Sequence, residues 1–203
     1  PPRKTRWLMV TVFNTLNFDL LKEKINHLTN KITDEIQEFV YGFEGTSIEE
    51  AVGALLKDNN LTLSIAESCT GGNISKMITS IPGSSAYYLG SVVSYANEIK
   101  QEFLGVSQSN LENYGAVSEQ VVREMQKGVL KQLKTDLSIA TSGIMGPTGG
   151  SPEKPVGTVY ICVGNSEKSV VEKLSLYKDR NLNIQYTSKR ALDILRKFIK
   201  NEY

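Results

Sequence analysis

The feature that most constrains the fold is a serine set between an apolar run at 61–65 and a pair of glycines, Gly71 and Gly72. The run is typical of a strand, and apolar residues recur beyond the glycines at helical spacing, at Ile74, Met77, Ile78 and Ile81. Ser68 is therefore predicted at a strand-to-helix turn, with free backbone N–H groups of the helix start pointing back toward it. Such a start could hold a phosphate, or the oxyanion formed when Ser68 attacks a carbonyl. The alternative is a serine N-cap followed by glycines needed only for close packing.

Composition sets broad limits on the class of protein. With 203 residues, 40% hydrophobic and 22% charged, the chain is expected to form one sizeable domain and a smaller element. The net charge of +1 gives no bulk electrostatic reason to bind nucleic acid directly. No apolar run approaches the length of a membrane span, and the N-terminus does not resemble a signal peptide. We therefore expect a cytoplasmic protein without membrane or direct nucleic-acid partners.

The residues that could bind metal or act as a base are few. Cys69 and Cys162 lie far apart without a ligand pattern around them, and His27 is the only histidine, so no metal site is expected. His27 lies in an amphipathic segment that is expected to be separate, too far away to activate a nucleophilic serine. Serine chemistry would then need a lysine as base.

Three lysines are candidates for that base, and the residues alone do not choose between Lys100, Lys76 and Lys154. An ordinary lysine has a pKa near ~10.4, so a lysine base needs a lowered pKa. We expect the charge of Arg180 to contribute to that lowering.

The order of predicted elements indicates an α/β fold. A strand at 7–13 and a helix at 16–39 precede a glycine-punctuated linker at 41–45, after which the pattern alternates. The expected elements are helix 47–57, strand 61–66, helix 73–81, strand 90–94, helix 97–103, helix 118–133, strands 136–141, 157–163 and 169–176, and helix 182–203. We predict a three-layer α/β/α sandwich with a mixed sheet, in which the last strands are antiparallel, over 46–203.

Short polar or glycine-rich segments are expected at the ends of predicted strands, where open α/β sheets bind their ligands. They lie at 82–85, 94–100, 115–118 and 141–150. The last of them continues to 158, and its glycines and prolines favour an irregular backbone that presents amide donors to a phosphate or carboxylate. The alternative is an ordered surface loop.

Taken together, these segments resemble the C-terminal domain of the competence/damage-inducible protein CinA family over about residues 46–200. The resemblance in order and spacing is carried by AESCTGG at 66–72, PGSS at 82–85, SYANEIK at 94–100, LGV at 104–106, YGAVSE at 114–119, TSGIMGP at 141–147 and EKPVGT at 153–158.

This resemblance implies a nicotinamide mononucleotide deamidase, a serine amidohydrolase that uses a Ser/Lys pair without a cofactor. Carried over by motif, Ser68 is the nucleophile and Lys100 the base, with Tyr95 and Thr141 as catalytic neighbours. The substrate-binding residues that it implies are Thr70, Gly71, Gly72, Asn97, Gly143, Gly146 and Arg180.

The resemblance also has implications for the rest of the chain. In longer relatives this domain follows a small linking domain related to KH folds, so residues 1–45 are expected to be the last strand and helix of such a domain, a small α+β remnant. A homo-oligomer, dimeric or larger, is expected. The sequence departs from the family pattern at Lys178 and at Met145. Residues 181–186 also lack the arginine that the family often has there, and weaker phosphate binding would follow from this third departure.

Three functions remain open at this point. The first is the deamidase, the second a nucleotide-binding module without turnover, and the third a scaffold for DNA uptake or repair. The sequence disfavours the third function, because it has neither a basic stripe nor a set of base-stacking aromatic residues. Ammonia release from nicotinamide mononucleotide separates the first from the other two.

Overall fold

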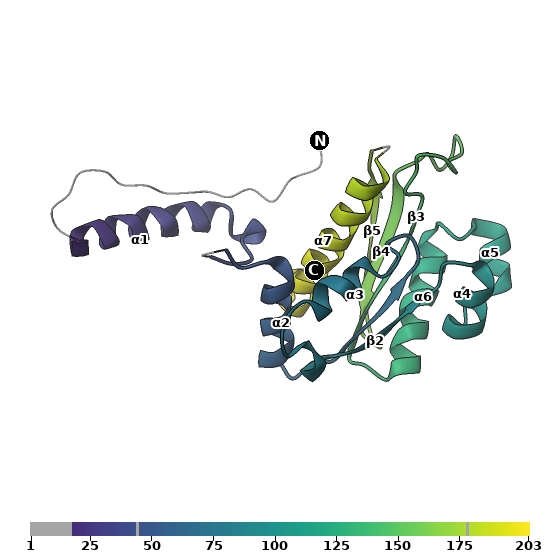
Figure 1. Cartoon of the computed structure of the whole chain (residues 1–203), viewed down its shortest axis with the longest axis horizontal. Helices are drawn as coiled ribbons and strands as arrows, with labels where there is room; N and C mark the ends of the chain where they lie inside the picture. The colour runs from purple at the N-terminus through teal and green to yellow at the C-terminus, as the bar shows by residue number, and fades with distance from the viewer. Residues whose placement is uncertain (1–17, 44, 178) are drawn as a thin grey trace. The chain divides into compact units, whose positions relative to one another are not determined.

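The computed structural model describes residues 18–43, 45–177 and 179–203, and the chain divides into two compact units, Pro1–Thr46 and Ser47–Tyr203 (Figure 1). In the first unit, helix α1 (Phe18–Glu35) is followed by a short 3₁₀ turn, η1 (Gln37–Phe39). The helix predicted over 16–39 thus ends earlier than expected, and no residue of α1 is buried. The strand predicted at 7–13 lies outside the described residues.

The second unit is built on a five-stranded sheet with the strand order β2-β1-β3-β4-β5. Its strands are β1 (Leu63–Glu67), β2 (Tyr88–Val93), β3 (Leu137–Gly143), β4 (Thr158–Gly164) and β5 (Ser169–Ser175). Strands β2 and β3 both run parallel to β1, whereas β4 is antiparallel to β3 and to β5. The prediction of a mixed sheet with antiparallel last strands is confirmed.

Helices cover both faces of this sheet (Figure 1). On one face α6 (Glu119–Leu133) packs across the strands, and α4 (Asn97–Leu104) and α5 (Gln108–Tyr114) pack on α6. On the other face lie α3 (Asn73–Thr79) and α7 (Arg180–Ile199), with α2 (Ile48–Asp58) packed on both of them. The second unit is therefore a three-layer α/β/α sandwich, as predicted, with α5 as an additional helix.

The position of α4 is set by its close approach to α6. The apolar side of α6, which includes Val122 and Met125, packs into a core with the small strand residues Ala66 and Ala140. At Gly128 a Cβ atom would lie 1.9 Å from the Leu104 carbonyl oxygen, so only glycine lets α6 approach α4 this closely. This contact fixes the helix that carries Lys100.

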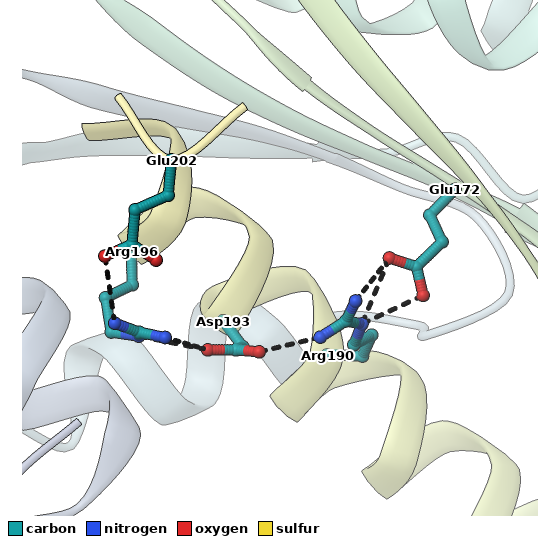
Figure 2. Close-up of polar contacts among 5 residues, drawn as sticks. All are labelled: Glu172, Arg190, Asp193, Arg196 and Glu202. Atoms are coloured by element: carbon teal, nitrogen blue, oxygen red, sulfur yellow. Dashed lines mark hydrogen bonds and ion pairs between the residues drawn. The ribbon is translucent and has the colours of Figure 1, made fainter. Parts of the chain in front are cut away.

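Helix α7 is joined to the edge strand β5 by a chain of charged side chains (Figure 2). The Arg190 guanidinium lies 2.6 Å from Glu172 of β5 and 2.7 Å from Asp193. Arg196, only 1% exposed, contacts Asp193 at 3.0 Å, and Glu202 lies 3.8 Å from it. The hydrogen bonds to Glu172 are the largest cause of a raised pKa of Arg190. The network fixes α7 against the sheet.

Candidate functional site

The three parallel strands end at the same edge of the sheet, and this brings three polar segments together. Glu67 at the end of β1 pairs with Val93 of β2 and with Thr141 of β3. Just beyond, the Ser68 backbone N–H donates to the Thr141 carbonyl oxygen at 3.1 Å, and the Ser94 N–H donates to the Glu67 carbonyl oxygen at 2.9 Å. The predicted nucleophile thus lies between the ends of β2 and β3.

Ser68 lies at the strand-to-helix turn that the sequence predicts. Its residue surface is 9% exposed, and its hydroxyl makes no hydrogen bond to any of the described residues. The turn continues through Gly71 and Gly72, whose φ angles of 60° and 94° are in the left-handed region that favours glycine. The chain can therefore reverse into α3 within a few residues.

The expectation that the first N–H groups of α3 are free to bind an anion is wrong. Those of Gly72, Ile74 and Ser75 donate to the Glu67 carboxylate at 3.0, 3.1 and 2.8 Å. Glu67 is fully buried, and a buried carboxylate needs such partners. In the described part of the chain, the backbone N–H of Thr70 makes no hydrogen bond, which leaves it as a candidate oxyanion donor.

Lys100 is a buried lysine at the same edge of the sheet. It is 1% exposed, and its Nζ donates to the carbonyl oxygens of Ser94 at 2.8 Å and Tyr95 at 3.2 Å. Burial lowers the pKa of Lys100, against opposing charge interactions with Cys69 and Glu98. Desolvation is thus the cause of the lowered pKa.

The expected contribution of Arg180 is not seen, because burial and not the charge of Arg180 accounts for the lowered pKa of Lys100. The structure also distinguishes between the three candidate lysines. Lys76 is exposed, and Lys154 is partly exposed with its Nζ on the Tyr114 carbonyl oxygen. Of the three lysines, Lys100 is the one whose pKa is lowered by burial, so it loses its proton most readily.

Cys69, next to the nucleophile, is a buried free thiol. Burial raises the pKa of Cys69 to about 12, although a hydrogen bond from Thr141 partly opposes this. Its thiolate is therefore scarce at neutral pH, which disfavours it as the nucleophile. The Thr141 hydroxyl also lies 2.9 Å from the Thr70 hydroxyl, so Thr141 joins the end of β3 to the turn after Ser68.

Arg180 and Tyr95 form an exposed contact near the edge of the sheet that holds Ser68. We call this contact, together with Gly146, the rim. The Arg180 guanidinium donates to the Tyr95 hydroxyl and to the Gly146 carbonyl oxygen, both at 3.1 Å. Asn183 holds the same loop from α7, since its amide donates to the Met145 carbonyl oxygen at 3.0 Å. The rim therefore joins segments that follow β2, β3 and β5.

The remaining predicted residues make no contact with Ser68 or Lys100 among those described above. Asn97 is exposed at the start of α4, and Gly146 has a left-handed φ of 83°. At Gly143 a Cβ atom would lie 2.7 Å from the Val159 side chain, so close packing against β4 accounts for this glycine.

Sequence reasoning missed three residues of this region, Glu67, Ser94 and Asn183. A charged residue at the end of an apolar strand was the available signal for Glu67. Ser94 is fully buried, and its Oγ has no hydrogen-bond partner within the described residues. Nothing in the local sequence around Asn183 indicates that its side-chain amide donates to the carbonyl oxygens of Met145 and Tyr177.

Within the residues that the structure describes, no group of three or more His, Cys, Asp or Glu side chains is arranged to hold a metal ion. None of the described helices combines the length and apolar character that crossing a bilayer requires.

Comparison with known proteins gives consistent matches. The family model described as CinA C-terminal domain matches residues 45–199. A CinA-like protein from Cytophaga hutchinsonii is 42% identical over 184 residues, 91% of this chain and 44% of the relative. One from Pseudothermotoga lettingae is 45% identical over 179 residues, 88% of this chain and 44% of the relative. The chain thus spans less than half the length of these curated relatives.

Solved structures match about three quarters of the chain. The competence/damage inducible protein CihA from Agrobacterium tumefaciens has a TM-score of 0.70 and 34% identity, covering 76% of this chain and 96% of its own. A competence-damaged protein (CinA) superfamily protein from Klebsiella pneumoniae has a TM-score of 0.73 and 29% identity, covering 77% of this chain and 99% of its own.

Proposed function

Because the chain belongs to the CinA C-terminal domain family, we propose that its second unit hydrolyses nicotinamide mononucleotide to nicotinate mononucleotide and ammonia. The observation that carries this proposal is Lys100, a buried lysine with a lowered pKa at the same edge of the sheet as Ser68. A Ser/Lys pair is a known solution to serine chemistry without histidine.

In the first step, Ser68 Oγ attacks the carboxamide carbon while Lys100 Nζ accepts the hydroxyl proton. A neutral lysine has two N–H bonds and one lone pair. The carbonyl oxygens of Ser94 and Tyr95 can accept the two N–H bonds, which leaves the lone pair for the proton of Ser68. The oxyanion that forms is stabilised by the Thr70 backbone N–H.

In the second step, the tetrahedral intermediate breaks its C–N bond. The protonated Lys100 gives its proton to the departing nitrogen, so ammonia leaves and an acyl ester remains on Ser68. Water then attacks the ester as Lys100 accepts a proton again. Return of that proton to Ser68 Oγ releases nicotinate mononucleotide and restores the free enzyme.

The rim supplies the positive charge that a nucleotide monophosphate needs. Arg180 presents a guanidinium next to Tyr95, and guanidinium binds phosphate through paired N–H donors. We assign the phosphate of the substrate to Arg180, and the carboxamide to the edge that holds Ser68 and Lys100.

A second candidate function is nucleotide binding without turnover, and one observation fits it as well as it fits the deamidase. The Ser68 hydroxyl makes no hydrogen bond to Lys100, which instead contacts two carbonyl oxygens. In unliganded enzymes catalytic hydrogen bonds often form only when substrate binds, so this geometry is compatible with both functions.

The test is incubation of the purified chain with nicotinamide mononucleotide, with and without a metal chelator. The deamidase proposal expects ammonia and nicotinate mononucleotide in equal amounts, unaffected by the chelator. Saturable binding without ammonia would favour the binding module. If the chain neither binds nicotinamide mononucleotide nor releases ammonia from it, both functions are contradicted.

A further inference from the structure

We propose that Glu67 is a positioning residue for Ser68, because its buried carboxylate holds the turn that carries the nucleophile. This inference rests on the proposed function in one respect only, that Ser68 is the nucleophile. It does not depend on which amide is the substrate.

Glu67 is anchored through both its side chain and its backbone. Besides the three backbone N–H groups of Gly72, Ile74 and Ser75, its carboxylate accepts a hydrogen bond from the Ser75 hydroxyl at 2.6 Å. Its own carbonyl oxygen accepts from the Ser94 N–H. The residue before the nucleophile is therefore fixed to β2 on one side and to α3 on the other.

Packing does little to hold the two glycines of this turn, although Ser68, Cys69 and Thr70 before them are buried. A Cβ atom at Gly71 would meet no atom within 4 Å, and one at Gly72 would meet only the Val93 side chain, at 3.9 Å. Glycine also has the largest backbone freedom of any residue. The hydrogen bonds to Glu67 are thus a principal restraint on the turn that follows Ser68.

The chemistry of the four partners requires a carboxylate. All four act as donors to Glu67, two on each oxygen, and an ionised carboxylate accepts at both oxygens. A glutamine would turn its NH₂ group toward one of these donor pairs. The turn would then shift, and with it Ser68 and the Thr70 N–H.

A shift of this kind should reduce the reactivity of Ser68 without changing Arg180, to which we assign the phosphate of the substrate. Glu67 is fully buried, and the rim residue Arg180 lies on another element. Misplacing a reacting group by about 1 Å costs up to roughly 100-fold in rate. The effect belongs in kcat rather than in KM.

The test compares the Glu67→Gln and Glu67→Asp variants with Ser75→Ala, and with Thr79→Ala as a matched control. Thr79 lies at the other end of α3, where its hydroxyl donates to the Ser75 carbonyl oxygen. Each protein is checked for folding by thermal unfolding. Covalent labelling of Ser68 by a fluorophosphonate probe is then timed, and kcat and KM are measured with nicotinamide mononucleotide.

We expect folded Glu67→Gln and Glu67→Asp proteins to label about 10- to 100-fold more slowly than wild type, with KM within about 3-fold. Ser75→Ala, which removes one of four donors, should label about 2- to 5-fold more slowly, and Thr79→Ala should match wild type.

Wild-type labelling rates in a folded Glu67 variant of lowered thermal stability would show that Glu67 only caps α3. If neither Glu67 variant folds, a wild-type rate for Ser75→Ala would equally show that Glu67 only caps this helix. Labelling of wild-type Ser68 without hydrolysis of nicotinamide mononucleotide would overturn the proposed substrate and leave the Glu67 comparison decisive. Absence of labelling in wild type would overturn the nucleophile, and this inference with it.

Discussion

At the scale of single residues, burial decides what the charged groups near Ser68 can do. Lys100 lies almost entirely out of solvent with two backbone carbonyls as acceptors, and the desolvation lowers its pKa. Lys76 and Lys154 have the same side chain but lie at or near the surface. Sequence composition does not reveal this difference, and without the structure only the family motif points to Lys100.

The role of Lys100 as a base predicts the outcome of a charge-conserving change. Arginine keeps the charge but does not release its proton, so Lys100→Arg should fold and lose at least about 100-fold in kcat. Wild-type kcat/KM should rise with pH, because only the neutral amine of Lys100 can accept a proton. Since burial lowers the pKa of Lys100, the midpoint of this rise should lie below the ordinary lysine value of ~10.4.

This rising limb should be absent from any residual activity of the variant. If Lys100→Arg keeps more than about a tenth of the wild-type kcat, a barrier change under ~1.4 kcal/mol, Lys100 is an electrostatic or binding residue instead.

The two thiols provide a second check at this scale. Burial raises the pKa of Cys69 to about 12 and that of Cys162 to about 11, so both are expected to be protonated at about pH 8. In the folded protein both thiols should react with a disulfide reagent far more slowly than in the urea-unfolded protein. The absorbance of the thiolate that the reagent releases follows the reaction. Fast reaction of one thiol in the folded protein would show that the Cys69 or Cys162 site is open and its thiolate accessible.

At the scale of helices and strands, the apolar patterns predict most of the second unit. Buried strands and amphipathic helices such as α6 leave a strong periodic signal, so their order was predictable. Helix α5 has only seven residues with apolar side chains at Leu111 and Tyr114, too few for a pattern. The role of Glu67 depends on the turn after Ser68, which brings three backbone N–H groups to the Glu67 carboxylate. No local sequence pattern predicts that turn.

Helix α7 provides the prediction at this scale. Asp193 connects Arg190 with the buried Arg196, so Asp193→Ala weakens the contacts of both guanidinium groups. We expect a loss of about 1–3 kcal/mol in the free energy of unfolding, measured by urea denaturation.

Glu202→Ala is the matched control, because Glu202 lies 3.8 Å from Arg196 and is one-third exposed. It should cost less than about 1 kcal/mol. Equal losses in the two variants would show that Asp193 has no special part in holding α7.

At the scale of the whole molecule, the chain combines two units with different relations to known proteins. The solved relatives cover about three quarters of this chain and nearly all of their own length, and the CinA C-terminal domain model matches residues 45–199, nearly the same residues as the second unit. The alignments to longer relatives exceed the length of the second unit and so include part of the first. That residues 1–45 belong to a linking domain related to KH folds stays a prediction.

A truncated chain of residues 47–203 tests this division. Because the described sheet and all the proposed site residues lie within the second unit, the truncated protein should fold and keep kcat within about 3-fold of the full chain. Circular dichroism and the ammonia assay check the two parts of this expectation. A folded truncated protein without turnover would show that the first unit contributes to the site.

The proposed serine mechanism is tested most simply by comparing ammonia release from nicotinamide mononucleotide by wild type and by Ser68→Ala. Ser68 makes no side-chain hydrogen bond within the described residues, so its loss should leave the fold intact. Removing a covalent nucleophile should lower kcat by about 1,000-fold or more. Release by wild type with almost none from the folded variant is the predicted result, and near-equal release by the two proteins would contradict a mechanism that depends on Ser68.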